Sequence, residues 1–531
     1  MNNQNLINFG ESVFSDIDTN PYLNQLYENI LYNYSLDLFG GSGDKKQINV
    51  DDALRFADIL SKSNIADTQK SDKHKLWAQE IIALLKKTEP DNPLIDYYYT
   101  SVLSNIGNYR GIKLIKSDHR CGTLLDTLYS EFSKDYFTIP AEPDKTFFRS
   151  QKTVYDNLEK PYFSYSGPTS MGKSFIMRMF IKEQVTKGAA ANFALLVPTK
   201  ALINEVTSKI INDLTVKLAE HNYTVVTSAG AIALKQDHNF IFVLTPERLL
   251  YLLIDNPNLQ IDYLFVDEAH KISSKDERSA FYYKVIDMVS RKERKPHVIF
   301  SSPNIPNPEI YLKLIPNAEL LEEKKLATTF APVSQVKYLV DIPHNQIDLY
   351  NSYTDDFLSV EPLAQKTSFC DFISMIGHSS QNIVYCRSTA KTVELAREFA
   401  ESQETQEDKR LIALSRDVRN EVHGDYYLAD VIVKGVAYHI GYLPSTIRLR
   451  IEELFKEGLI KTLFCTSTLL EGVNLPADNL FITNYYNGRK KFTPVDFKNL
   501  IGRVGRLEYN LYGNVFLVRL EENTKINEFV E

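Results

Sequence analysis

The sequence has few cysteines, a single tryptophan and no long apolar run. Its four cysteines are widely scattered among 531 residues, without metal-ligand spacing, which favours core thiols in a reducing, cytoplasmic compartment. No apolar run approaches the roughly 18 residues of a membrane-spanning helix, and the start of the chain does not resemble a signal peptide. An excess of positive charge is also lacking, because the net charge is −8. Any contact with nucleic acid therefore has to use a local groove.

Three regions of the chain differ in pattern. With 531 residues, 44% of them hydrophobic, the chain is long enough for about three domains with large cores. Residues 1–143 are expected to form a helical accessory domain, with an amphipathic helix over 75–87. Residues 144–325 alternate apolar strands with helical stretches, which predicts a parallel sheet covered on both faces. Residues 326–378 are expected to be a connector, and the alternation resumes over 379–531, which predicts a second sheet domain.

Short apolar runs mark the expected strands, and polar residues follow several of them. Parallel sheets bind ligands at the carboxyl ends of their strands, so these polar residues are the candidates for function. The expected strands are 161–165, 193–197, 240–244, 264–266 and 297–300 in the first sheet, 336–340 in the connector, and 382–385, 436–439, 463–465, 480–483 and 514–518 in the second sheet.

The most specific motif is GPTSMGKS at 167–174, which fits the pattern GxxxxGK[ST] between an expected strand and an expected helix. Its glycines let backbone N–H groups turn around phosphates at the positive end of a helix. Lys173 can reach the β- and γ-phosphates, and Ser174 can ligate Mg²⁺. The plain alternative is a glycine turn between strand and helix. The residues expected to bind ATP here are Gly167, Thr169, Gly172, Lys173 and Ser174.

A second motif, LFVDEAH at 264–270, reads as an apolar strand that ends in two carboxylates. Asp267 is expected to hold Mg²⁺ through its water shell, and Glu268 to orient or deprotonate the attacking water. An acidic pair after a strand is otherwise a solvated surface feature, and the phosphate loop upstream favours the catalytic role. Because only one sheet region carries a phosphate loop, ATP is expected in the cleft between the two.

Further motifs follow in order along both sheet regions. They are RSQ, PTKAL, TPER, SSPNIPN, YCRS, GVAYH, TSTLLEGVNLP and GRVGR, at 149–151, 198–202, 245–248, 301–307, 385–388, 435–439, 466–476 and 502–506. The series closely resembles the superfamily 2 DExH-box helicases, and the sixth and seventh motifs are most similar to the Ski-type branch. The resemblance implies two tandem RecA-like parallel-sheet domains preceded by a mostly helical N-terminal domain. It also implies an ATP hydrolase with ATP and Mg²⁺ as cofactors.

The same resemblance implies roles around the nucleotide. Gln151 matches the glutamine that reads the adenine edge. Arg503 and Arg506 match arginines that reach the γ-phosphate from the second sheet domain, where they stabilise transition-state charge and couple closure to the ATP state. Together with Lys173 and Glu268 they are the expected catalytic residues.

Other family loops grip the nucleic-acid strand. Their hydroxyls, backbone N–H groups and cations suit phosphate contacts that ignore base identity. Each hydroxyl by itself is also a common helix cap or turn former. The matching residues are Pro198, Thr199, Lys200, Thr245, Pro246, Arg387, Ser388, Thr466 and Thr468.

An Asn-Gly pair at 487–488, flanked by strand-prone aromatic residues, predicts a hairpin. Ski-type helicases that unwind carry a hairpin in this interval as a wedge at the duplex junction. Tyr485 and Tyr486 are expected to stack on bases, and the basic residues 489–491 to contact phosphates. The alternative is a plain solvent-exposed hairpin.

Some positions depart from the family pattern. In the SSPNIPN stretch at 301–307, Ser302 and Pro303 stand where the family normally has Ala and Thr. In the family this stretch, called the third motif, links hydrolysis to strand separation. Asn499 replaces a glutamine, and Ile440 replaces a second histidine. Ski-type enzymes continue into winged-helix and helical-bundle domains that close around the strand. Either this chain is truncated, or a partner protein is expected to supply that closure.

The sequence therefore predicts an ATP-dependent helicase or translocase that moves along single-stranded or partly duplex nucleic acid, and the resemblance implies movement from 3′ to 5′. One alternative is a duplex translocase that does not unwind. Another is an ATP-gated binding subunit of a larger complex, such as a genome-defence complex. The residue pattern leaves DNA and RNA both open.

Overall fold

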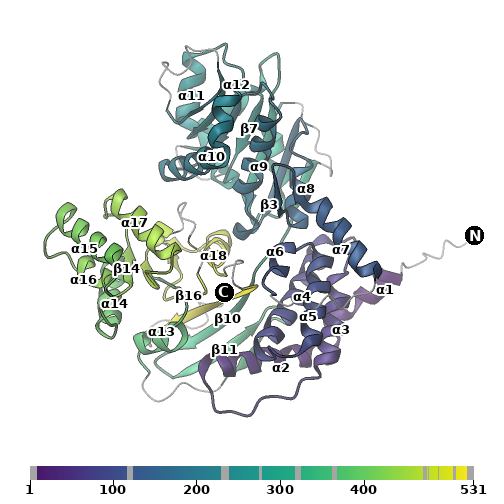
Figure 1. Cartoon of the computed structure of the whole chain (residues 1–531), viewed down its shortest axis with the longest axis vertical. Coiled ribbons are helices and arrows are strands. Elements are labelled where there is room, and N and C mark those ends of the chain that lie inside the picture. Colours follow the sequence, from purple (N-terminus) through teal and green to yellow (C-terminus); the bar gives the residue numbers. More distant parts are fainter. Residues whose placement is uncertain are drawn as a thin grey trace, which may run out of the picture. The chain divides into compact units, whose positions relative to one another are not determined.

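The computed structural model describes most of the chain, and its contacts divide the described residues into two units (Figure 1). The first unit holds residues 124–331 with 107–109, and the second holds the helical region before them together with residues 332 onwards. Among the described residues, no helix is long and apolar enough to cross a membrane. The described residues are 9–115, 124–228, 238–273, 278–316, 318, 324–360, 367–469, 475, 477–487, 490–505 and 510–522.

The first unit is built on a parallel sheet, as its alternating pattern predicts. Its described strands lie in the order β5-β6-β4-β7-β8-β3-β9, and every pairing is parallel. All carboxyl ends therefore meet at one edge. The strands are β3 (Tyr162–Gly167), β4 (Phe193–Leu196), β5 (Tyr223–Val226), β6 (Asn239–Leu244), β7 (Tyr263–Val266), β8 (His297–Pro303) and β9 (Lys325–Ala327).

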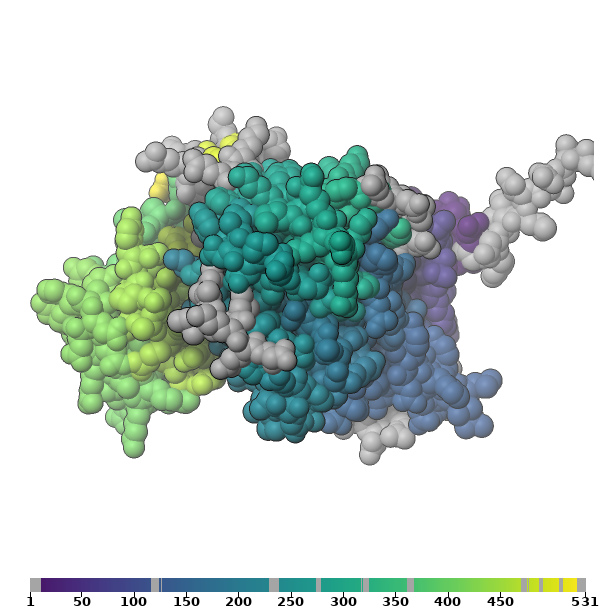
Figure 2. Space-filling view, turned by 90° about the horizontal axis from the view of Figure 1, so that it is seen from above, coloured from purple at the N-terminus to yellow at the C-terminus, as the bar shows by residue number. Residues whose placement is uncertain are grey.

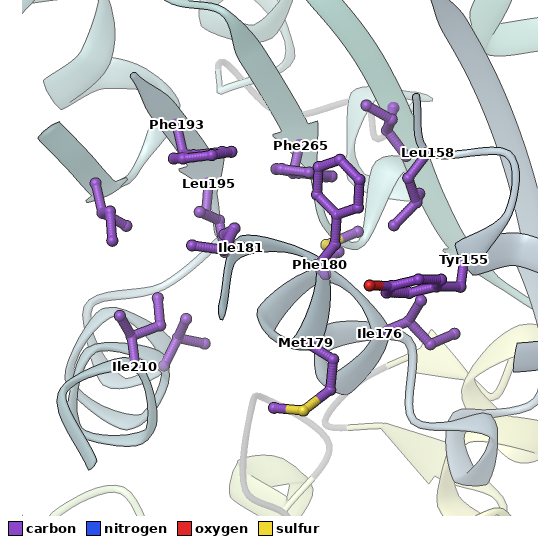
Figure 3. Close-up of a cluster of buried hydrophobic side chains, with 14 of the residues drawn as sticks. Tyr155, Leu158, Ile176, Met179, Phe180, Ile181, Phe193, Leu195, Ile210 and Phe265 are labelled. Carbon is purple, nitrogen blue, oxygen red and sulfur yellow. The ribbon is translucent and has the colours of Figure 1, made fainter. Parts of the chain in front are cut away.

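Helices cover both faces of this sheet, because strand residues alternate between two hydrophobic clusters. Phe265 belongs to the cluster of α8, α9 and α10, and its neighbour Val266 belongs to the cluster of α11 and α12. In the first cluster the ring of Phe180 on α9 lies between Phe265 and Tyr155, with centroids 6.1 Å from each (Figure 3). The helices are α8 (Arg149–Tyr155), α9 (Lys173–Thr186), α10 (Lys200–Glu220), α11 (Pro246–Asp255) and α12 (Ser279–Ser290); α7 (Leu124–Phe137), β1 (Thr138–Ile139) and β2 (Glu142–Thr146) precede them.

The second unit contains a mixed sheet in the order β12-β11-β10-β19-β16-β13-β15-β14. The strands from β10 to β14 in this order are parallel, and β11 and β12 extend the sheet in antiparallel fashion. The predicted strands at 382–385 and 436–439 coincide with β13 and β14. The strands are β10 (Ser334–Asp341), β11 (Gln346–Asn351), β12 (Asp356–Ser359), β13 (Asn382–Tyr385), β14 (Val436–His439), β15 (Thr462–Cys465), β16 (Asn479–Ile482) and β19 (Tyr512–Arg519).

Helices after β12 complete this sheet domain, and the light-green residues at the left of Figure 2 show part of the outer surface that they form. The described cysteines of the domain, Cys370, Cys386 and Cys465, are buried free thiols, as expected; Cys121 lies outside the described residues. The helices are α13 (Phe369–Gly377), α14 (Thr389–Glu401), α15 (Lys409–Glu421), α16 (Leu428–Ile432), α17 (Ser445–Lys456) and α18 (Pro494–Ile501).

The N-terminal helices pack directly on this second sheet. The hydroxyl of Tyr34 donates to Asn514 Oδ1 at 2.8 Å, and the Phe39 ring lies 5.3 Å from that of Tyr338 on β10. The predicted helix over 75–87 lies within α4. The helices are α1 (Phe9–Ser15), α2 (Pro21–Phe39), α3 (Val50–Ser61), α4 (Thr68–Thr88), α5 (Pro93–Ile106) and the short α6 (Tyr109–Ile112).

The expected connector, residues 326–378, supplies β10, β11, β12 and α13 to the second unit. Only the run at 336–340 was expected to be a strand. The connector was not expected to belong to the second sheet. It does so because β10 pairs in parallel with β19, with Tyr338 opposite Phe516, and a pairing over such a sequence separation leaves no local signal. Two tandem RecA-like sheet domains with a helical N-terminal region are therefore present, with the helices sharing a unit with the second sheet.

Candidate functional site

The phosphate loop connects β3 to α9 at the carboxyl edge of the first sheet. Gly172 adopts the left-handed region, with φ 75°, directly before the first residue of α9. A Cβ at Gly172 would lie 3.0 Å from Gln151 Nε2, so a side chain at this position meets both strain and crowding. Only glycine fits at this position, and the loop backbone can therefore approach phosphates closely.

Lys173 folds back over the loop. Its Nζ donates to the carbonyl oxygens of Gly167 and Pro168, each at 3.2 Å, and the residue is 5% exposed. Burial lowers the pKa of Lys173, while the nearby carboxylates of Glu268 and Asp267 act in the opposite direction. A buried cation that donates its hydrogen bonds to neutral carbonyl oxygens gains from a directly bound anion, so phosphate oxygens fit this position.

Ser174 and Asp267 meet beside the lysine. The Ser174 hydroxyl donates to Asp267 Oδ2 at 2.7 Å. Burial raises the pKa of Asp267, and the charge of Glu268 raises it further. A divalent cation offsets that cost of ionisation, and hydroxyl and carboxylate oxygens are the ligands that Mg²⁺ prefers. These residues therefore fit a nucleoside triphosphate with a divalent metal ion.

Glu268 differs from its neighbour in exposure and in backbone. Its side chain is 28% exposed, whereas Asp267 is 6% exposed, so Glu268 can reach water at this edge. Its φ of 53° is unusual for a residue other than glycine, and such strain costs on the order of 1–3 kcal/mol and clusters at functional sites. Glu268 Oε2 also lies 3.2 Å from His270 Nδ1.

The SSPNIPN stretch at 301–307, the altered third motif, contacts both Asp267 and the start of the phosphate loop. Ser301 Oγ donates to Asp267 Oδ1 at 3.2 Å. The Asn304 N–H donates to the carbonyl oxygen of Gly167 at 3.2 Å, and the Ser302 hydroxyl donates to the Tyr165 carbonyl oxygen at 3.5 Å. The motif therefore supports the carboxylate and the start of the phosphate loop. Motif order placed Ser301 near the site, but no sequence signal indicates this hydrogen bond.

Gln151 is a structural support of the phosphate loop. It is 1% exposed; its Oε1 accepts from the Phe148 N–H at 2.9 Å, and its Nε2 donates to the Met171 carbonyl oxygen at 2.7 Å. The amide thus ties the start of α8 to the loop. Its expected contact with adenine stays a prediction.

Several residues that were expected to contact the nucleic-acid strand are helix caps in this structure. Thr199 Oγ1 accepts from Leu202 N–H at 3.3 Å, and Ser388 Oγ accepts from Lys391 N–H at 3.3 Å. Thr245 stands at the N-cap of α11, is 4% exposed and precedes Pro246 in the first turn. Pro198 and Lys200 flank the cap of α10. The loops of residues 198–200 and 245–246 thus lie at the carboxyl edge of the first sheet, and Ser388 lies at that of the second sheet. Their contact with a nucleic-acid strand stays a prediction.

In the second sheet domain, Thr468 is held by a buried histidine. His439 Nδ1 lies 2.9 Å from Thr468 Oγ1, and His439 Nε2 lies 3.1 Å from Glu452 Oε1 on α17. Thr466 follows β15 and donates its N–H to the His439 carbonyl oxygen at 3.4 Å. This network positions the loop after β15, and the sequence indicated the threonines but not Glu452.

The predicted hairpin is present as the antiparallel pair β17 (Tyr486–Asn487) and β18 (Lys490–Lys491). Asn487 pairs with Lys490, so it belongs to the strand and not to the turn; residues 488–489 lie outside the described residues. The Arg387 guanidinium lies 4.5 Å from the Tyr486 ring centroid, a cation–π contact. The Tyr485 and Tyr486 rings lie 4.8 Å apart. Arg387 and the hairpin therefore form one cluster.

Of the two arginines expected at the γ-phosphate, Arg503 and Arg506, the structure describes only Arg503. Arg503 follows α18; its N–H donates to the Leu500 carbonyl oxygen, and its carbonyl oxygen accepts from the Ala477 N–H at 3.2 Å. Arg506 lies outside the described residues. The roles expected for both at the γ-phosphate stay predictions.

Comparisons with known proteins agree with this geometry. The DEAD/DEAH box helicase family matches residues 149–309, and the helicase conserved C-terminal domain matches residues 367–508. The chain is 27% identical to the ATP-dependent DNA helicase Hel308 of Pyrococcus horikoshii, over 67% of this chain and 48% of that protein. It is 23% identical to the anti-bacteriophage protein B of Escherichia coli K12, over 75% of this chain and 50% of that protein. The chain thus spans about half the length of these relatives.

Proposed function

Because the chain carries the two domains of a superfamily 2 DExH-box helicase, we propose that it hydrolyses ATP to move 3′ to 5′ along a single nucleic-acid strand. The observation that carries the proposal is the meeting of Lys173, Ser174 and Asp267 at one sheet edge. Several relatives are named DNA helicases, so DNA is the proposed strand. These relatives favour a Hel308-type placement within the superfamily, and the narrower Ski-type placement stays a proposal.

Each residue of the nucleotide site has a proposed role in ATP hydrolysis. Lys173 binds the β- and γ-phosphates, and the loop from Gly167 to Gly172 with Thr169 offers backbone N–H groups to them. Ser174 and Asp267 hold a divalent cation, proposed to be Mg²⁺. When bound, that cation neutralises charge that develops on the phosphates. Glu268, the more exposed carboxylate, accepts a proton from the attacking water.

The second sheet domain supplies positive charge to the same reaction. We assign Arg503 and Arg506 to the γ-phosphate, where such arginines contribute roughly 10³–10⁵ to the rate. Gln151 is assigned to the adenine edge as well as to its observed support of the phosphate loop.

Strand binding is assigned to the loops at the carboxyl edges of both sheets, and strand separation to the hairpin of Tyr485 and Tyr486. Arg387 already contacts Tyr486, so a phosphate held by Arg387 would lie beside the Tyr486 ring. The accessory domains or partner protein that would close around the strand, the cytoplasmic location and the sequence-based domain boundaries remain proposals.

A second candidate function is an ATP-gated strand-binding or duplex-translocating subunit in genome defence. Two observations favour it: the similarity to the anti-bacteriophage protein B over 75% of this chain, and Ser302 with Pro303 in place of the usual third-motif residues. The first candidate separates the strands of a duplex, whereas the second does not unwind.

The test measures phosphate release with no nucleic acid, with a single-stranded DNA oligonucleotide and with the RNA of the same sequence. Stimulation by DNA that disappears in Lys173→Ala supports the proposal. Stimulation by RNA alone would reassign the strand. Displacement of a labelled strand from a duplex with a 3′ overhang then separates the candidates, since hydrolysis without displacement selects the second.

A further inference from the structure

Tyr442 projects from a tight turn at the end of β14. The N–H of Leu443 donates to the carbonyl oxygen of Ile440 at 3.3 Å, which closes a turn with Gly441 and Tyr442 at its tip. Ile440 and Leu443 are 2% and 3% exposed, whereas Tyr442 is 88% exposed. Two buried corner residues thus anchor the turn and hold the tyrosine in water. The burial of Ile440 also gives a physical reason for the isoleucine that replaces the second histidine of the family.

The turn lies on the same sheet edge as the expected strand contacts. Strand β14 pairs in parallel with β15, and β15 pairs in parallel with β13, so their carboxyl ends lie side by side. Tyr442 follows β14, Thr466 and Thr468 follow β15, and Arg387 follows β13. A Cβ at Gly441 would lie 3.6 Å from Thr468 Cγ2, so the turn and the threonine loop are in close proximity.

Single exposed tyrosines are ordinary on protein surfaces, and three properties distinguish this one. Its exposure exceeds that of Tyr427, at 50% the next most exposed described tyrosine of the domain. The Tyr427 ring is covered by the Arg397 guanidinium at 3.8 Å, whereas no described residue makes a hydrogen bond or ring contact with Tyr442. Finally, its turn is preformed, so a base can bind without reordering the backbone.

We propose that Tyr442 is a base-stacking platform for the single strand that passes over this edge. The proposal rests on the proposed function and assigns to the chain a nucleic-acid contact that its helicase motifs do not include. The phosphates lie against Arg387 and the threonine loop, and one unpaired base lies on the face of the Tyr442 ring. Because every base has a π-face, the platform tolerates any sequence.

The experiment measures the affinity of the full chain for a fluorescein-labelled single-stranded DNA by anisotropy, with a non-hydrolysable ATP analogue present. Stacking on an aromatic residue is worth about 1–3 kcal/mol per base, which predicts about 5- to 150-fold weaker binding for Tyr442→Ala. Tyr442→Phe keeps the ring and should bind as the unmodified protein does. The matched control is Tyr251→Ala on α11, since Tyr251 is also exposed, at 57%, but lies in the body of a helix.

A second readout uses a DNA that carries a single 2-aminopurine, scanned along the strand. One position should show stacking-dependent quenching with the unmodified protein and with Tyr442→Phe, and lose it with Tyr442→Ala. Equal affinity and quenching in Tyr442→Ala would overturn the platform while leaving the proposed function intact. A weakened Tyr442→Phe would overturn it too, because the hydroxyl would then be the contact. Absence of DNA binding by the unmodified protein would refute the proposed function and the platform together.

Discussion

The carboxyl group of Glu80 is buried where α4 packs on the second sheet domain. Glu80 is 5% exposed; its Oε1 accepts a short hydrogen bond from the Tyr27 hydroxyl, and its Oε2 accepts from the Tyr353 hydroxyl at 3.2 Å. Burial raises the pKa of Glu80 to about 7, against the opposing effects of the Tyr27 hydrogen bond and the charge of Lys337. We therefore expect the packing of the N-terminal helices to weaken as pH rises.

The magnitude follows from the two states of the carboxyl group. In the unfolded chain it ionises near pH 4.3, and in the folded protein near pH 7. Between these values the folded state binds more protons, so the free energy of unfolding falls as pH rises, and the loss is complete above pH 7. At 1.36 kcal/mol per pH unit the full loss is about 3.5 kcal/mol, of which about 2.5 kcal/mol falls between pH 5 and pH 8. Glu80→Gln removes this dependence, because the amide does not titrate.

The assay follows urea unfolding by tryptophan fluorescence. The chain has one tryptophan, and Trp77 stacks on Tyr353 with ring centroids 4.7 Å apart, so its emission reports on this junction. Relative to the unmodified protein, Glu80→Gln should gain about 2.5 kcal/mol between pH 5 and pH 8. Glu89→Gln, at the exposed end of the same helix, is the matched control and should show no such gain. Equal pH dependence in Glu80→Gln and the unmodified protein would refute the reasoning.

Further predictions concern the chemistry and the hairpin. Lys173→Ala should weaken ATP binding and turnover together, whereas Glu268→Gln should keep ATP bound and slow turnover by about 10²–10⁴-fold; binding of a fluorescent ATP analogue and phosphate release separate the two, and near-normal turnover in Glu268→Gln would exclude it as the base. Arg503→Ala should slow turnover at nearly unchanged nucleotide affinity, and a loss of affinity alone would contradict that role. Replacing Tyr485 and Tyr486 by Ala should impair strand displacement but not strand-stimulated hydrolysis; a parallel fall of both activities would leave the hairpin as a connection only.

Most of the parallel strands could be predicted because their residues are buried on both faces, whereas the partly exposed strands β5 and β9 were not predicted. The run at 436–439 coincides with β14, whose residues are all buried. The predicted run at 336–340 lies within β10, but its place beside β19 could not be predicted, since a parallel pairing is set by crossover connections and not by local pattern. The packing of the N-terminal helices on the second sheet could not be predicted either, because nothing in the sequence indicates that Phe39 contacts Tyr338.

Within the nucleotide site, motif spacing predicted which residues would be neighbours, and the structure adds how they touch. Ser174 and Asp267 were expected to share a metal ion, and the hydrogen bond between them places their oxygens 2.7 Å apart. The bond from Ser301 to Asp267 could not be predicted, because it depends on the register of β8 against β7. The left-handed backbone of Glu268 has no sequence signal either, since glutamate rarely adopts it.

The hydroxyls of Thr199 and Ser388 show why sequence could not choose between helix cap and strand contact. In a parallel sheet covered by helices, each helix begins at the carboxyl edge of the preceding strand, so its capping residue stands at the ligand-binding edge. Both hydroxyls cap helices here, yet a hydroxyl oxygen that accepts from a backbone N–H can still donate its own proton. One side chain can therefore fix the loop and contact a phosphate at once, which makes cap and contact compatible roles for the same residue.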